Sequence, residues 1–206
     1  MRSLICEWIA STLGAQLGLP IAPFKIANVS SELVGISLRS DISDLGIGRA
    51  FASQKAQVTE LSTSHIEFVP VQSQLDVLAF DWWIHNNDRC LGEMGGNPNL
   101  FWDIEKQLLV VIDHNQAFDP HFSEQNFVDL HVFRDQIDLL LRDKALQGHY
   151  FEHFSQVMTE WQSICDTIPT EWWFADPEET VRTEFDVEAT RQLLMRFQAN
   201  EFWMPS

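Results

Sequence analysis

The stretch HNNDRCLGEMGGNPNLFWDIEKQLLVVIDH, residues 85–114, decides the fold class because its character changes sharply along its length. Its first half is polar and holds three glycines and a proline, which is typical of a loop. The apolar runs NLFW and QLLVVID follow, and the four residues DIEK between them read as a turn. This half of the pattern predicts a β-hairpin that ends at an aspartate, Asp113.

Helical patterns flank this stretch on both sides. Before it, apolar residues recur at helical spacing over residues 3–17 and 73–86, and after it over 133–147, 150–165 and 186–199. The sequence therefore predicts an α+β chain that is mostly helical, with a small β-hairpin set among the helices.

The segment between the first two helices is less regular. Residues 22–29 predict a strand, whereas residues 39–57 are rich in Ser, Asp and Gly and predict a loop. Gly46 and Gly48 form a lone GxG. No strong strand precedes it and a third glycine is absent, so a flexible turn is favoured over a phosphate-binding loop.

Composition narrows the class of protein. The net charge is −17, and a protein that grips nucleic acid by neutralising phosphates is normally basic, so no direct nucleic-acid partner is expected. Three cysteines without a paired motif fit a reducing cytoplasm. No apolar run is long enough to predict a membrane span, and the first residues lack the pattern of a signal peptide.

The order of polar residues suggests a chemistry. Asp88 lies in the polar loop, Asn97 and Asn99 close that loop, and Asp113 ends the hairpin. Phosphoryl transfer needs such parts, namely a carboxylate that orients the acceptor hydroxyl, and an amide oxygen and a second carboxylate that hold Mg²⁺. Mg²⁺ prefers oxygen ligands, which Asp and Asn supply.

These residues carry a resemblance to a known family. Asn86-Asn87-Asp88-Arg89, Asn97 to Trp102 and Val111-Ile112-Asp113-His114 resemble the HipA-like serine/threonine kinases, and more distantly the phosphatidylinositol-kinase-like catalytic loop. The first helix and the stretches 50–53 and 78–81 also fit, so the resemblance runs from residue 1 to about residue 118. The residues after about 118 resemble the family only in that they are mostly helical.

The resemblance implies a role for each matching residue. Asp88 matches the catalytic-loop aspartate, and Arg89 beside it would steady the loop through a contact with a carboxylate. Asn99 best matches the metal-binding asparagine and Asn97 is the competing choice, while Asp113 matches the second metal ligand. The cofactors implied are ATP and Mg²⁺. Glu7 is close to the helix glutamate that pairs with the ATP-binding lysine in kinases.

Two departures from the kinase pattern stand out. Asp88 lies nine residues before Asn97 and eleven before Asn99, whereas kinases place the two about five apart. The extra segment, Leu91 to Gly96, would either push the asparagine away or bulge outward. None of the four lysines precedes Glu7, and Lys25 comes after it, so the smaller ATP-binding lobe (N-lobe) is expected to be largely absent, strands included.

The expected organisation is a single, N-terminally short HipA-like kinase domain over residues 1–206. Residues 1–70 would be a remnant of the N-lobe and hinge, and residues 71–206 the helical catalytic lobe (C-lobe), whose hairpin carries the metal site. A chain of this kind is a fragment of a longer product, a partner for a separate N-lobe protein, or a pseudokinase.

The leading functional hypothesis is Mg-ATP-dependent phosphoryl transfer to a Ser or Thr of a protein substrate. Many HipA-like kinases are toxins, so the resemblance also implies an antitoxin partner. One alternative is an inactive partner-binding subunit that docks an antitoxin or a separate N-lobe through its exposed first helix. Another is a metal-dependent phosphoester hydrolase that uses Asp88 and Asp113.

Overall fold

The computed structural model describes residues 1–36, 46–55, 57–92, 95–103 and 105–204. The described segments contain α-helices (α), short 3-10 helices (η) and strands (β). In chain order they are α1 (Arg2–Gln16), β1 (Phe24–Val29), α2 (Ser31–Ile36), β2 (Gly48–Ser53), β3 (Thr59–Glu60), η2 (Thr63–Phe68), α3 (Val71–Trp83), β4 (Cys90–Gly92), β5 (Gly95–Asn97), β6 (Leu100–Asp103), β7 (Leu108–Val111), α4 (Glu124–Leu130), η3 (Arg134–Gln136), α5 (Ile137–Arg142), α6 (Lys144–Met158), α7 (Trp161–Asp166), η4 (Thr170–Trp173), α8 (Val187–Met195), η5 (Arg196–Gln198) and η6 (Asn200–Trp203).

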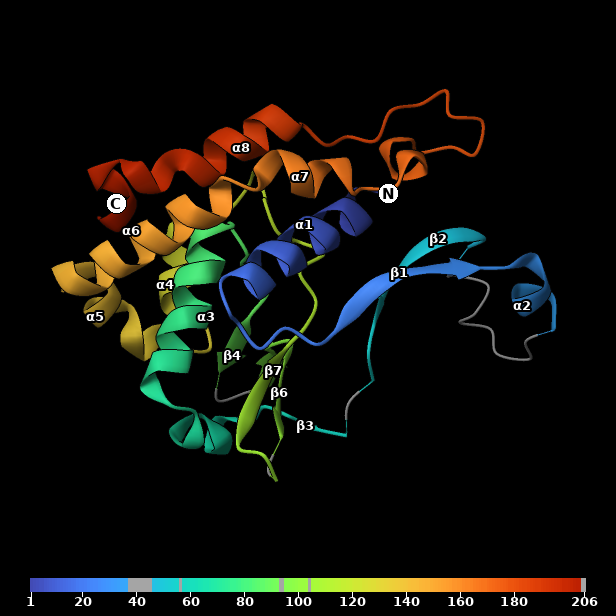
Figure 1. Cartoon of the computed structure of the whole chain (residues 1–206). Coiled ribbons are helices and arrows are strands. Elements are labelled where there is room, and N and C mark those ends of the chain that lie inside the picture. Colours follow the sequence, from blue (N-terminus) through green and yellow to red (C-terminus); the bar gives the residue numbers. More distant parts are fainter. Residues whose placement is uncertain (37–45, 56, 93–94, 104, 205–206) are drawn as a thin grey trace.

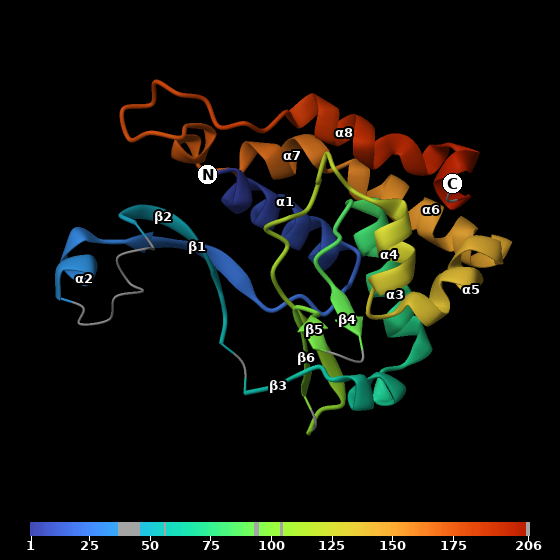
Figure 2. The same ribbon diagram turned by 180° about the vertical axis from the view of Figure 1, so that it is seen from behind.

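Helices α1 and α3 lie in the middle of the molecule (Figure 1). Helices α6, α7 and α8 form a layer on one side of them, and the hairpin of β6 and β7 lies at the opposite side. Strands β1 and β2 extend away from the helices, with α2 at their outer end, and the same arrangement is visible from behind (Figure 2). The α+β class expected from the sequence is confirmed.

The core is rich in aromatic side chains around the end of α3. The ring of Trp83 is stacked on Phe154 of α6, with centroids 4.2 Å apart. Its indole Nε1 donates to the carbonyl of Leu194 at 2.7 Å, and Nε1 of Trp82 donates to the carbonyl of Phe202 at 2.9 Å. Buried indoles need such partners, so these two bonds tie α3 to the last helical turns of the chain.

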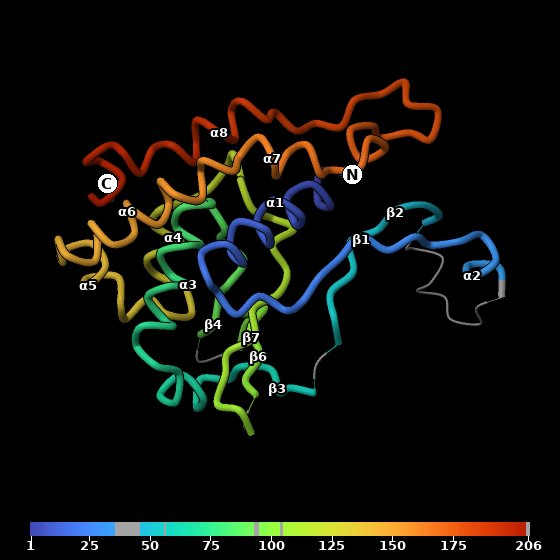
Figure 3. The backbone as a smooth tube through the Cα atoms, in the orientation of Figure 1, coloured from blue at the N-terminus to red at the C-terminus, as the bar shows by residue number. Residues whose placement is uncertain are grey.

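The hairpin that carries Asp113 forms as the pattern predicts. Strands β6 and β7 pair antiparallel with Leu100 opposite Val111, and β3 pairs with the outer side of β6. The link after α1 runs along β7, where Ile21 bridges Val111 in parallel (Figure 3). Backbone on both sides therefore holds the end of β7, the point from which Asp113 projects.

Two expected loops contain strands. Residues 48–53, inside the predicted loop 39–57, form β2 and pair antiparallel with β1, so the N-terminal third holds more sheet than expected. Gly46 and Gly48 both adopt positive φ, which explains the glycines without a phosphate. Residues 37–45 and 56 of that prediction lie outside the described residues.

The polar loop after α3 also contains regular structure. Strands β4 and β5 form a second hairpin within it, in which Cys90 pairs with Asn97 and Leu91 with Gly96. Figure 2 shows β4 beside α4, and Cys90 also bridges His131. The described residues of the extra segment therefore pair with each other in a hairpin, and the chain then enters β6.

The predicted helix over 133–147 is wrong as a single element. It is divided into η3, α5 and α6, and the break before α6 lies at Asp143, whose Oδ1 accepts from the backbone N–H groups of Ala145 and Leu146. An aspartate that caps a new helix start competes with continuing the old one.

The expectation of an exposed first helix is also wrong. Ile5, Ile9 and Leu13 of α1 are fully buried, and α1 contacts β2, α7 and η4 of the same chain. The apolar stripe of this helix is therefore covered within the chain, and it offers no free docking face.

Gly96 should be needed for the β4–β5 hairpin. A Cβ atom built on Gly96 would lie 2.2 Å from the carbonyl oxygen of Cys90, so either the chain must shift or the pairing must break. We expect Gly96→Ala to cost about 1–3 kcal/mol in the free energy of unfolding, measured by chemical denaturation. Gly92→Ala is the matched control, because its nearest atom would be 3.9 Å away. Equal losses in the two variants would contradict this account.

Candidate functional site

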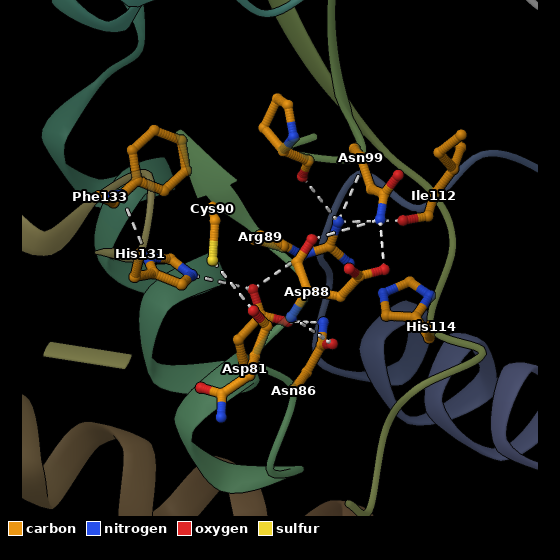
Figure 4. Close-up of polar contacts among 12 residues, drawn as sticks. Asp81, Asn86, Asp88, Arg89, Cys90, Asn99, Ile112, His114, His131 and Phe133 are labelled. Atoms are coloured by element: carbon orange, nitrogen blue, oxygen red, sulfur yellow. Dashed lines mark hydrogen bonds and ion pairs between the residues drawn. The ribbon is translucent and has the colours of Figure 1, made fainter. Parts of the chain in front are cut away.

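A buried ion pair forms the base of the candidate site (Figure 4). Nε of Arg89 lies 2.8 Å from Oδ2 of Asp81 on α3, and both side chains are 0% exposed. Asn86 donates to the other oxygen of Asp81 at 2.8 Å, and Nε2 of His131 lies 3.2 Å from Oδ2. Burial alone would raise the pKa of Asp81, but the Arg89 guanidinium together with His131 and Asn86 holds that pKa below its ordinary value.

Arg89 also gathers three backbone carbonyls. Its Nη1 atom lies 3.3 Å from the carbonyl oxygen of Pro98 and 3.0 Å from those of Asn99 and Ile112. Because Pro98 and Asn99 precede β6 and Ile112 follows β7, one guanidinium fixes both ends of the hairpin. Arg89 is fully buried, so it acts on the loop and not on a bound substrate.

Asn99 lies beside Asp88, although eleven residues separate the two in sequence. Its Nδ2 atom donates to Oδ2 of Asp88 at 3.0 Å, and no described residue donates to its amide oxygen. Asn97 is exposed on β5, and no described side chain forms a hydrogen bond with it. The geometry therefore brings Asn99, and not Asn97, to Asp88.

Asp113 completes this group of polar side chains. Its negative charge acts on Asp88, and burial followed by that charge raises the pKa of the Asp88 carboxyl above its ordinary value. Asn99 and Asp113 both adopt positive φ, at 50° and 57°. Non-glycine residues rarely take this conformation, and where they do the surrounding structure has to enforce it.

Glu7 of α1 holds the residue that follows Asp113. Its Oε2 atom accepts the backbone N–H of His114 at 2.6 Å, and its Oε1 atom accepts from the hydroxyl of Ser11 at 3.4 Å. No lysine among the described residues contacts Glu7. Burial lowers the pKa of His114 although Glu7 opposes it, so the ring is neutral at neutral pH.

A cavity of about 350 Å³ opens beside Asp113. It lies between α1, β2 and the end of the β6–β7 hairpin. The residues that line it are Ser3, Leu4, Glu7, Phe51, Ser53, Ile112, Asp113 and Asn115. A space of this size falls in the range of small-molecule sites.

The described segments contain no group of three or more His, Cys, Asp or Glu side chains placed to hold a metal ion. They also contain no helix that is long and apolar enough to cross a membrane.

Several residues of this site were not assigned a role from the sequence. Asp81 ends the stretch 78–81 that resembles the family, but the resemblance gives it no role, and its other signal is a carboxylate between two aromatic residues of α3. Asn86 opens the stretch 86–89 that resembles the family but receives no role from that resemblance, and Ser11 and His131 belong to no motif. Their partners come from distant parts of the chain, which periodicity does not reveal.

The buried pair should be costly to break. We expect Asp81→Asn to lose about 3–5 kcal/mol of unfolding free energy, because it leaves the Arg89 guanidinium buried without its counter-charge. Chemical denaturation measures the loss. The control is Asp138→Asn, which removes an exposed pair with Arg142 and should change stability little. Similar effects in both variants would argue against the central role of Arg89.

Asp88 should reduce stability where it is ionised. Its folded-state pKa is raised, so the folded protein binds the proton more tightly than the unfolded chain, and ionisation costs stability above the ordinary aspartate pKa of about 4. We expect Asp88→Asn to raise the Tm modestly at neutral pH, and the gain to vanish below about pH 4. Thermal unfolding across this pH range measures it. A gain that persists in acid would contradict the explanation.

One comparison with known proteins identifies a family for the chain. The model of the HipA-like kinase family matches residues 1–206, which extends the resemblance through the helices beyond residue 118. A search of curated proteins found no match to the chain. A match over all 206 residues establishes the family. The chain therefore belongs to the HipA-like kinases.

Proposed function

We propose that this chain transfers a phosphoryl group from Mg-ATP to a serine or threonine hydroxyl of a protein substrate. In this proposal Asp88 accepts the hydrogen bond of the acceptor hydroxyl and orients it. Asn99 and Asp113 bind Mg²⁺, and Arg89 positions the loop that carries Asp88. Bound Mg²⁺ would neutralise charge on the transferring phosphoryl group.

The observation that carries the proposal is the convergence of Asp88, Asn99 and Asp113. They come from the loop after α3, from the position just before β6 and from the segment just after β7. A 3.0 Å hydrogen bond joins the first two, and the charge of the third acts on the first. This is the set of groups, and the order along the chain, that phosphoryl transfer requires.

The chemistry of the donors suits Mg²⁺. The amide oxygen of Asn99 and the carboxylate of Asp113 are hard oxygen ligands, and Mg²⁺ is usually bound by one or two carboxylates together with water and phosphate. Burial raises the pKa of Asp88 and the charge of Asp113 raises it further, and a cation here would offset that second contribution. The cavity beside Asp113 supplies adjacent space for the phosphates.

We further propose that residues 1–70 form the N-lobe and hinge portion and residues 71–206 the catalytic lobe. Membership of the family favours a protein partner, either an antitoxin or a protein that supplies further N-lobe structure. One observation favours the alternative of an inactive, partner-binding subunit. Both oxygens of Glu7 are engaged within the chain, and no described lysine reaches them.

Stabilisation by Mg-ATP tests the proposal. A ligand that binds only the folded state adds about 2.7 kcal/mol at a concentration of 100 times Kd, so the wild type should show a clear rise in Tm. Asp113→Ala and Asn99→Ala should lose the Mg²⁺-dependent part of that rise. Asn97→Ala is the matched control, because Asn97 is exposed two residues away, and it should behave as wild type.

Phosphate transfer separates the two candidate functions. Transfer of a labelled γ-phosphate to protein by the wild type, with its loss in Asp88→Asn, would establish the kinase. Binding of Mg-ATP without transfer, in the presence and absence of a partner, would favour the binding subunit. The absence of any Tm shift at millimolar Mg-ATP would contradict the proposed nucleotide site.

A further inference from the structure

Two polar side chains, Glu7 and Ser11, lie within the buried face of α1 that covers the site. Ser11 is 1% exposed and follows Glu7 by one helical turn, while its other buried neighbours on α1 are mainly apolar. Across from it lies His114, the residue after Asp113, which is 0% exposed. A buried hydroxyl requires partners, so the contacts of Ser11 indicate why it is there.

The hydroxyl of Ser11 joins Glu7 to His114, the residue that follows Asp113. It donates to Oε1 of Glu7 at 3.4 Å, and its oxygen lies 3.3 Å from Nδ1 of His114. A hydroxyl has one proton to donate, so a bond to Glu7 leaves its lone pairs to accept from Nδ1–H. Oε1 of Glu7 is also 3.7 Å from Nδ1, which disfavours a lone pair on that nitrogen.

The remaining surroundings of His114 are largely apolar. Phe80 of α3 lies with its ring centroid 5.8 Å away, at an interplanar angle of 77°. Nε2 of His114 is buried and has no hydrogen-bond partner among the described residues. The Nδ1 side of the ring is thus the only polar anchor that the described residues give it, and Ser11 and Glu7 provide that anchor together.

We propose that Ser11 is a positioning residue, which sets the orientation of Asp113 for Mg²⁺ through the buried Glu7–Ser11–His114 cluster. Oε2 of Glu7 holds the His114 amide at 2.6 Å, and Ser11 fixes both the other oxygen of that carboxylate and the His114 ring. Asp113 precedes this clamp and has a φ of 57°, a conformation that needs such support. The inference rests on the proposed function only in its metal-binding part.

Amide hydrogen exchange in the ligand-free protein tests the positional part. Ser11→Ala removes only the hydroxyl and favours helix, so α1 should still form. We expect the His114 amide, which donates to Glu7, to exchange about tenfold faster than in the wild type. Thr12→Val is the matched control. It removes a neighbouring hydroxyl of α1 that bonds to the carbonyl of Trp8 and does not reach His114.

Mg²⁺ titration tests the functional part. At a fixed saturating concentration of ATP, we expect Ser11→Ala to raise the apparent Mg²⁺ dissociation constant about tenfold, as removing outer-shell support of a metal ligand does. The Tm measured without Mg²⁺ should fall no further than in Thr12→Val. The affinity for metal-free ATP should not change.

The outcomes distinguish this inference from the proposed function. Unchanged exchange of the His114 amide in Ser11→Ala would overturn the inference, whether or not the wild type binds Mg-ATP. Faster exchange with unchanged Mg²⁺ affinity would overturn the claim that Ser11 acts on the metal site. A wild type that does not bind Mg-ATP at all would overturn the metal-binding part of the inference together with the proposed function, and would leave the exchange result to decide the positional part.

Discussion

The buried ion pair between Arg89 and Asp81 is the interaction on which the site depends. Removing two charges from water costs several kcal/mol for each ion, so such a pair is weak evidence for net stability. The pair instead fixes the position of the Arg89 side chain. Because Asp81 holds Nε of Arg89, the Nη1 atom of Arg89 reaches the carbonyls of Asn99 and Ile112. Residues that are distant in sequence are thereby held at one point.

The site is also a place where the backbone is held in costly conformations. Four of the six described non-glycine residues with positive φ flank it: His85, Asn99, Asp113 and Phe118. Each such conformation costs on the order of 1 kcal/mol or more. Backbone hydrogen bonds support them, including Phe118 N–H to the carbonyl of Ile84 at 2.7 Å and Ile112 N–H to that of Asn99 at 3.2 Å. The aromatic core around Trp83 supplies the stability that allows this strain.

Sequence reasoning succeeded where the signal was local. The β6–β7 hairpin was predictable because two apolar runs with a turn between them have few other folds, and Asp113 follows from it. The β4–β5 hairpin was missed because short glycine-rich strands show no alternation, and β2 was missed within a segment of loop-like composition. The same argument applies to the site. Asp88 sits in a motif, whereas Asp81 and Ser11 acquire meaning only from partners that tertiary packing provides.

Glu7 connects the two functions considered for this chain, the active kinase and the inactive partner-binding subunit. Its Oε2 atom is committed to the His114 amide at 2.6 Å, but Oε1 has only longer contacts, at 3.4 Å to Ser11 and 3.7 Å to His114. Glu7 also lines the cavity beside Asp113. A cation that entered this cavity would therefore compete with Ser11 for Oε1 and leave the bond to His114 in place. Pairing of Glu7 with a lysine and support of Asp113 are thus compatible, and the Ser11 hydroxyl, which contacts both Oε1 of Glu7 and the ring of His114, is the group through which one would affect the other.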